Sequence, residues 1–162
     1  MNKTCVVVAD AGVARFYDVE VVNTPRARLA LVEGPPLNND TDLKSRGAAV
    51  TGRVRTETNT DRGAGPVHPI GEQRERHRGE LDRRFGQEIV LRIGEITSGW
   101  PGGLVVLVAE PRLLGLVREP LRRTLNARIE LKELAKDYTK LTAKELLERL
   151  GLEKMTAANR AR

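Results

Sequence analysis

The order of hydrophobic and polar positions predicts strands at the start of the chain. The run from Thr4 to Ala9 is apolar and β-branched, and residues 13–22 alternate between apolar and polar side chains. Turn residues between two such runs are typical of a β-hairpin. Residues 28–32 predict a third strand, which ends before Pro35 because proline has no N–H to give to a sheet. The N-terminal part therefore predicts an antiparallel meander.

A long amphipathic helix is predicted over residues 72–97. Its apolar residues recur every three or four positions, which forms one apolar stripe beside a charged face. Gly86 and Gly94 lower the helix propensity, and we expect them where the helix presses closely on the sheet. The stripe consists of Leu81, Phe85, Ile89, Ile93 and Ile96.

The C-terminal half alternates strands with helices. Residues 104–109 form a solid apolar strand, and residues 112–125 form a helix that Pro120 is expected to bend or split. An alternating strand over residues 127–131 is expected near a sheet edge, and a capping box at Thr142 starts the last helix. Short joints between these elements indicate parallel strands in a covered sheet. The chain is thus predicted to be α/β.

The segment between residues 37 and 71 has few large apolar residues and many glycines and arginines. Such a segment buries too little apolar area to offset the entropy of ordering it. We therefore predict one domain over residues 1–150 with a flexible basic loop at 37–71. Residues 151–162 are predicted to be a flexible tail.

Composition limits the classes of function. The chain has 162 residues, a formal net charge of +6 and a pI near 9.9, which favours an anionic partner such as RNA. The single cysteine, Cys5, excludes an internal disulfide and is expected to be a buried strand thiol. The apolar runs are too short to span a bilayer or to form an export signal. A cytoplasmic location without membrane contact is the expectation.

Five segments resemble the bacterial host attachment protein family. They are residues 6–16, 77–88, 108–118, 133–142 and 145–149. That family is similar to the central, ribonuclease-H-like domain of archaeal and eukaryotic peptide release factors. The resemblance implies a ribonuclease-H-like mixed sheet, with three antiparallel strands, a long helix and then a β-α-β-α unit. It also implies a part in attachment to host cells, which we expect to be indirect and intracellular because no export signal is seen.

The resemblance implies one further site at the start of the long helix. Residues 71–73 lie where the release factors carry a Gly-Gly-Gln tripeptide, but Glu72 replaces the second glycine. Its charge and its Cβ obstruct a close backbone approach, so peptide release by this route is not expected.

A metal-dependent nuclease is the leading alternative. Asp10 ends the first strand, where ribonuclease-H-like nucleases carry a metal-binding carboxylate, and Glu33 and Asp137 also lie at element ends. Two-metal chemistry would require these acids to converge. The simpler interpretation, which we favour, is that Asp10 shapes the hairpin turn and that Asp137 forms hydrogen bonds with the backbone of the segment before Thr142.

Arginines of the loop and the early helix are the candidate nucleic-acid-binding residues. Their stretch contains no Phe, Tyr or Trp for base stacking, so we expect contact with the phosphate backbone of ribosomal or other structured RNA. Sequence-specific DNA recognition is not expected. No catalytic residue, cofactor or metal site is predicted, and a protein-interaction scaffold is a third possibility. The candidates are Arg53, Arg55, Arg62, Arg74, Arg76 and Arg78.

Overall fold

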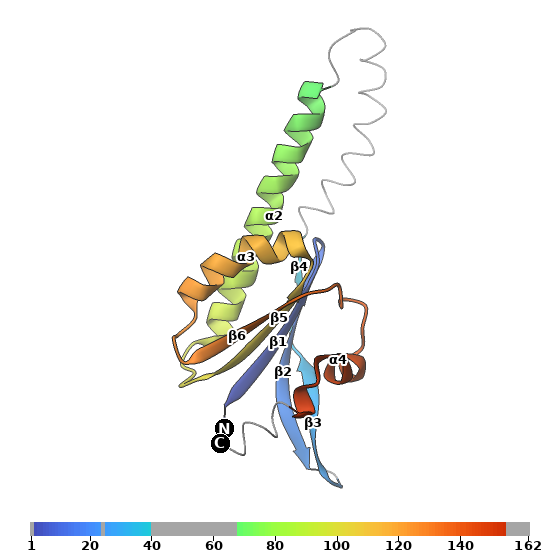
Figure 1. Ribbon diagram of the computed structural model, residues 1–162, viewed down its shortest axis with the longest axis vertical. Helices are drawn as coiled ribbons and strands as arrows, with labels where there is room; N and C mark the ends of the chain where they lie inside the picture. The colour runs from blue at the N-terminus through green and yellow to red at the C-terminus, as the bar shows by residue number, and fades with distance from the viewer. Residues whose placement is uncertain (1, 24, 40–67, 155–162) are drawn as a thin grey trace.

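The computed structural model describes residues 2–23, 25–39 and 68–154. Within these ranges the strands form one six-stranded mixed sheet in the order β3-β2-β1-β5-β6, with β4 beside the start of β2 (Figure 1). The elements in chain order are β1 (Lys3–Ala9), β2 (Val13–Asn23), β3 (Ala27–Glu33), β4 (Leu37–Asn38), α2 (His68–Thr97), β5 (Gly103–Ala109), α3 (Pro111–Thr124), β6 (Ile129–Ala135) and α4 (Ala143–Leu150).

The pairing of the strands follows from the lengths of their connections. β1, β2 and β3 are antiparallel neighbours because short turns join them. β5 lies parallel to β1 and to β6, since a helix separates each from its parallel neighbour in the chain. The predicted α/β class, antiparallel meander and parallel C-terminal unit are therefore confirmed.

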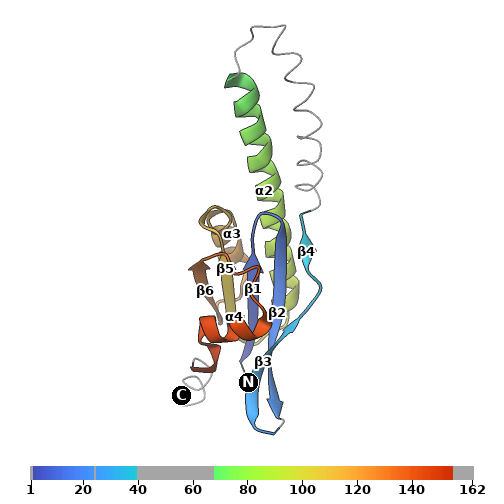
Figure 2. The ribbon, with the colours of Figure 1, turned by 90° about the vertical axis from the view of Figure 1, so that its right-hand side faces the viewer.

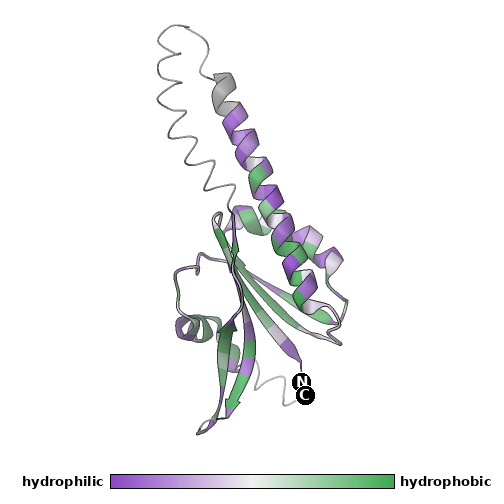
Figure 3. Ribbon diagram, turned by 180° about the vertical axis from the view of Figure 1, so that it is seen from behind, coloured by the Kyte–Doolittle hydropathy of each residue, from purple (hydrophilic) through white to green (hydrophobic). Residues whose placement is uncertain are grey.

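Helices cover both faces of this sheet, as Figures 1 and 2 show from two sides. Cys5, Val7 and Ala9 of β1 point to the face that α2 and α3 cover. Val6 and Val8 point to the face of α4. Because successive strand residues point to opposite faces, a strand segment covered on both sides must be apolar throughout, as residues 5–9 of β1 and residues 104–109 of β5 are. In Figure 3 the central strands are largely green, with purple at the start of β1.

The C-terminal part of helix α2 packs on the sheet, whereas its N-terminal part does not. Leu81, Phe85, Ile89 and Ile93 are buried against the sheet, as the apolar stripe predicts. Residues 73–78, in contrast, are all exposed, and this end of the helix projects away from the strands (Figures 1 and 2). The sequence thus divides one helix into an apolar base and a charged projecting end.

The predicted loop at 37–71 is too long at both ends. Leu37 and Asn38 form β4, which pairs with Ala14 and Val13 of β2. Leu37 packs on the core, so this one apolar residue is enough to hold the strand in place. α2 begins at His68, four residues earlier than predicted, because proline is well tolerated in the first helical turn. Residues 40–67 lie outside the described residues.

The prediction that Gly86 and Gly94 of α2 press on the sheet is wrong. A Cβ at Gly86 would lie 3.3 Å from Val117 Cγ2, and one at Gly94 would lie 3.0 Å from Thr124 Cγ2. Both neighbours belong to α3. The glycines therefore allow α2 and α3 to pack closely together, while the apolar stripe contacts the sheet.

Two other elements differ in detail from the predicted ones. α3 runs unbroken through Pro120, which is exposed, so the helix is not split there. β6 starts two residues later than predicted and continues to Ala135, although it carries Glu133. Arg118 of α3 donates to the Glu133 carboxylate at 2.8 Å, which makes an acidic residue acceptable in this half-buried position. The expected edge position of β6 is confirmed.

The predicted start of the last helix, α4, is confirmed. Thr142 accepts from the backbone N–H of Glu145, and the Glu145 carboxylate accepts from the backbone N–H of Thr142, which completes the capping box. These bonds lower the pKa of Glu145. Leu146 and, beyond the helix, Leu152 are buried against the sheet. The packed part therefore extends past the predicted boundary at residue 150, because Leu152 completes the apolar cluster.

Cys5 is a buried strand residue, as expected, with 1% of its surface exposed. Burial, with a further contribution from the Asp18 carboxylate, raises the pKa of this thiol to about 12. Only the thiolate is nucleophilic, so almost none of the reactive form exists near neutral pH. We expect a disulfide reagent to label Cys5 in denaturant but not in the native protein at pH 8. Labelling of the native protein as fast as that of the unfolded chain would contradict this burial.

Candidate functional site

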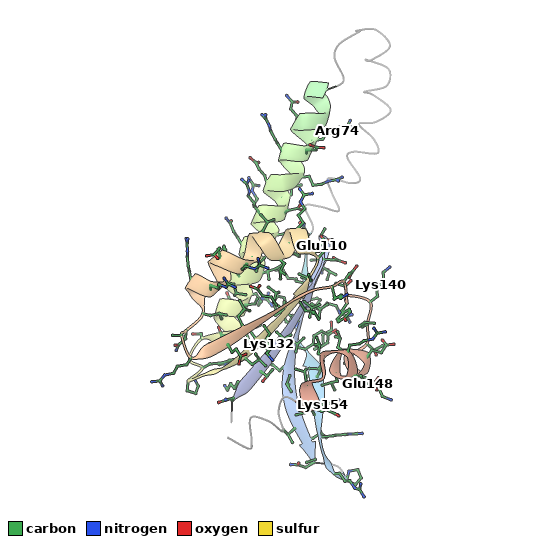
Figure 4. The ribbon with its side chains drawn as sticks, in the orientation of Figure 1. Arg74, Glu110, Lys132, Lys140, Glu148 and Lys154 are labelled. Carbon is green, nitrogen blue, oxygen red and sulfur yellow. The ribbon has the colours of Figure 1, made fainter. Side chains whose placement is uncertain are left out.

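The projecting end of α2 is an exposed, arginine-bearing part of the described chain. Arg74, Arg76 and Arg78 are all exposed there, and Figure 4 shows Arg74 near the end of the helix. Residues on a helix are rotated by about 100° from one to the next, so Arg74 and Arg78 share one side and Arg76 lies opposite. We call residues 73–80 the basic tip. Positive charge thus surrounds this part of the helix.

Acidic side chains modify the charge of the basic tip. Glu75 and Glu80 lie among the arginines, and both are exposed. The next acid along the helix, Asp82, pairs with Arg112 of α3 at 3.3 Å between side-chain atoms. Three arginines against two glutamates leave the tip with a small net positive charge. His77, also at the tip, is exposed.

A second polar group gathers where the strands end. Asp10 follows β1 and accepts from the backbone N–H groups of Gly12 and Val13, at 2.7 and 2.8 Å from its Oδ1. This bonding confirms that Asp10 shapes the hairpin turn. Its second oxygen, Oδ2, lies 3.1 Å from the hydroxyl of Thr139, which comes from the joint between β6 and α4. Asp10 therefore links the first turn of the chain to its last joint.

Thr139 is the centre of this group, which we call the polar network. Its hydroxyl also lies 2.7 Å from Asp137 Oδ1, and its backbone N–H donates to the same oxygen at 3.2 Å. The predicted role of Asp137 as a partner of backbone in this joint is thereby confirmed. Thr139 is 8% exposed, whereas Asp137 is exposed, so these bonds are partly buried. Its one hydroxyl proton serves two carboxylates, Asp10 and Asp137.

Arg15 of β2 joins the third acid to the polar network. Its guanidinium donates to both oxygens of Glu33, at 2.8 and 3.0 Å, and to the backbone carbonyl of Thr139 at 2.8 Å. The hydrogen bond to Glu33 raises the pKa of Arg15. The guanidinium also lies over the ring of Tyr17, 5.8 Å from its centroid. Burial raises the pKa of the Tyr17 hydroxyl, which forms no hydrogen bond within the described structure.

The structure therefore brings Asp10, Glu33 and Asp137 to one end of the sheet but fills the space between them. Thr139 and Arg15 bridge the acids, and this arrangement fastens the joint before α4 to the N-terminal meander. In the described ranges no group of three or more His, Cys, Asp or Glu side chains is arranged to hold a metal ion. The geometry gives no support to a two-metal nuclease at these residues.

Sequence reasoning missed Arg15 and Thr139. Arg15 occupies a position in β2 between Val13 and Tyr17 that alternation assigns to a covered face, and a charge at such a position indicates a buried partner. Thr139 gives no comparable signal, because two of its three partners, Asp10 and Arg15, are far away in the sequence. Three of the predicted nucleic-acid-binding residues, Arg53, Arg55 and Arg62, lie outside the described residues.

Comparison with models of protein families gives a match over most of the chain. The family model described as "Protein required for attachment to host cells" matches residues 5–150. No curated protein matches the chain. None of the described helices is long and apolar enough to cross a membrane. The matched range includes the meander, α2, the parallel unit and the polar network. Since it spans most of the sequence, the chain belongs to the family of proteins required for attachment to host cells.

Proposed function

We propose that this protein is a non-enzymatic binding module in host attachment, and that its basic tip binds the phosphate backbone of ribosomal or other structured RNA. The family supports the host-attachment role. One observation carries the RNA proposal: Arg74, Arg76 and Arg78 are exposed on a part of α2 that does not pack on the sheet. Guanidinium groups suit phosphate oxygens because they donate in a planar fork.

The distribution of charge around the basic tip favours binding in a groove of the RNA over binding on a flat RNA surface. Arg76 lies on the opposite side of the helix from Arg74 and Arg78. A helix lying on a flat surface would use one side only, whereas a groove between two phosphate backbones presents anions to both. Structured RNA offers such grooves. No aromatic residue lies between Leu37 and Leu81, so stacking on bases is not part of the proposal.

Two further relationships belong to the same proposal. The order of a three-stranded meander, a long helix and a β-α-β-α unit is compatible with a ribonuclease-H-like fold. A distant relation to the central domain of peptide release factors would also bring such a module to the ribosome. Because Glu72 stands where the release factors have a glycine, we propose that this protein keeps the binding property of that domain but not peptide release.

The test is a salt series of binding to purified ribosomes and to tRNA, with the full chain. Changing Arg74, Arg76 and Arg78 together to glutamate is expected to weaken binding at least about tenfold. The salt slope should fall by about three, roughly one for each lost phosphate contact. The matched control changes Arg26, Arg123 and Arg128 to glutamate, since these residues are exposed elsewhere and the change in net charge is equal. The control should lose less than about threefold.

Two results would reject the proposal. Equal losses in both triple variants would show that overall charge, and not the basic tip, attracts the RNA. Wild-type protein that binds neither ribosomes nor tRNA in a salt-sensitive way would favour a protein-interaction scaffold, whose basic surface serves solubility.

A further inference from the structure

One edge of the sheet is unprotected. β3 is the terminal strand, and among the described strands it pairs only with β2. It is seven residues long, contains no proline, and has the uncharged sequence Leu-Ala-Leu-Val at residues 29–32. Natural sheets usually protect an edge with charged residues, proline or a bulge, because its free N–H and C=O groups attract other strands. The middle of β3 has no such charge or proline.

The opposite edge, β6, has that protection. Its sequence alternates charged with apolar residues and includes Glu130, Lys132 and Glu133. Arg118 and Arg122 of α3 approach the Glu133 carboxylate, at 2.8 and 3.7 Å. The two edges of one sheet therefore differ, and the difference indicates that β3 pairs with another strand.

Among the residues that the structure describes, none covers the face of the sheet beside β3 as α2 and α3 cover the rest. α2 and α3 bury side chains of β1, β2, β5 and β6, but no β3 side chain belongs to that apolar cluster. Val32 of β3 is 44% exposed on this face. Val32 lies opposite Asp18 in the ladder with β2. Arg28 points to the same face of the sheet, two residues from Ala30 in the middle of β3. Both charged side chains are exposed. The exposed Val32 thus lies beside an acid, while a base lies four residues away on the same face of β3.

We propose that β3 pairs antiparallel with β3 of a second copy of this chain, with a two-fold axis at Ala30. In this register Arg28 lies opposite Val32 of the partner subunit, and Ala30 lies opposite its own copy, where small side chains cannot clash. Because Val32 pairs with Asp18 in each copy, Arg28 reaches across Val32 to Asp18 of the partner subunit. The two Cα atoms are two strand spacings apart, about 9.6 Å, which an arginine side chain can span.

The same register also suits the other face of the sheet. Leu29 comes to lie opposite Leu31 of the partner subunit, and in each copy these leucines belong to or pack against the cluster under α4. The two apolar clusters would become continuous across the axis. The interface repeats each contact twice, as a two-fold axis requires. The stem of Arg28 would cover the exposed Val32, which a charged residue with a long apolar stem does well.

The Arg28–Asp18 pair can form only between copies. Within one chain Arg28 pairs with Val22, which is four residues from Asp18 along β2. At about 3.4 Å per residue this separation is roughly 13 to 14 Å, beyond the reach of the two side chains. A charge exchange between these positions therefore tests association, because the Arg28–Asp18 pair itself does not exist inside one protomer.

Sedimentation velocity of the full chain over a range of concentrations tests the proposal. The wild type should reach twice the 17.9 kDa mass of one chain. Arg28→Glu and Asp18→Arg should each weaken the dimer by about tenfold or more, because each places like charges together. The double variant should return to within about threefold of the wild type. Arg123→Glu, exposed on α3 away from β3, serves as the control and should leave the dimer unchanged.

Three outcomes would overturn the proposal. The wild type could remain a monomer at all concentrations, in which case an extended segment of another protein becomes the candidate for β3. A dimer insensitive to both single changes would use a different surface. A double variant that stays as weak as the single variants, while its urea unfolding matches the wild type, would reject this register.

Discussion

Replacing Gly103 by alanine is expected to lower the free energy of unfolding by roughly 3 kcal/mol, the upper end of the range for overpacked sites. Gly103 opens β5 and lies opposite Lys3 in the parallel ladder with β1. A Cβ at this position would overlap the backbone carbonyl oxygen of Lys3 and lie 3.0 Å from Trp100 Cε3. The carbonyl belongs to the backbone of the neighbouring strand and cannot rotate away.

The position of Trp100 makes relaxation at Gly103 costly. The indole is 7% exposed and forms part of the apolar cluster under α2 and α3. The Lys3 ammonium group lies over its ring, 5.9 Å from the centroid. Moving the ring to admit a methyl group would open the end of this cluster. The energetic cost therefore falls on both strands and on the joint that follows α2.

Urea unfolding followed by far-ultraviolet circular dichroism measures this effect. Gly115→Ala is the matched control, because Gly115 lies in α3 with no atom within 4 Å of an added Cβ. Alanine should stabilise that helix by about 0.5 to 1 kcal/mol. If Gly103→Ala unfolds within about 0.5 kcal/mol of the wild type, the close approach of β5 to β1 is not the constraint described above.

Replacing Arg15 by methionine is expected to cost about 2 kcal/mol of unfolding free energy. The change keeps the apolar stem but removes three hydrogen bonds, two to Glu33 and one to the carbonyl of Thr139. A hydrogen bond to a charged group contributes about 1.5 to 3 kcal/mol, and the carbonyl of a buried residue would lose its partner. The figure stays near the low end because Arg15 and Glu33 are each about one-third exposed.

The control for Arg15 is Arg123→Met, which removes the same charge from an exposed position on α3. It should change stability by less than about 0.5 kcal/mol. Thr139→Val adds a second measurement, because it removes the hydroxyl shared by Asp10 and Asp137. If the polar network acts as one unit, the cost of the double variant will differ from the sum of the two single costs. Additive costs would mean that Arg15 and Thr139 act separately.

The sequence predicts those parts of the fold that depend on local pattern. The apolar stripe from Leu81 to Ile96 identifies the base of α2, and the capping box at Thr142 identifies the start of α4. Each signal lies within a single helix or its first turn, so it can be read without knowledge of distant residues. The solid apolar run of β5 likewise indicates a strand buried on both faces.

Elements whose stability depends on residues far away in the sequence could not be predicted from the local sequence pattern. β4 is only two residues long and exists because Leu37 meets β2 and the core. The extension of β6 through Glu133 depends on Arg118, which lies on a different element. The polar network joins residues separated by more than one hundred positions, such as Asp10 and Thr139. Asp10 and Asp137 could be assigned local roles, but their convergence follows only from the folded sheet.

The central place of β1 has a consequence for synthesis of the protein. One neighbour, β2, follows it directly, whereas the other, β5, follows about a hundred positions later. While the ribosome is still translating that interval, the valines of β1 form an edge open to solvent. Non-local pairing of this kind slows folding and leaves nascent chains prone to aggregate. Chaperone demand should consequently be greatest before the segment that begins at Gly103 emerges.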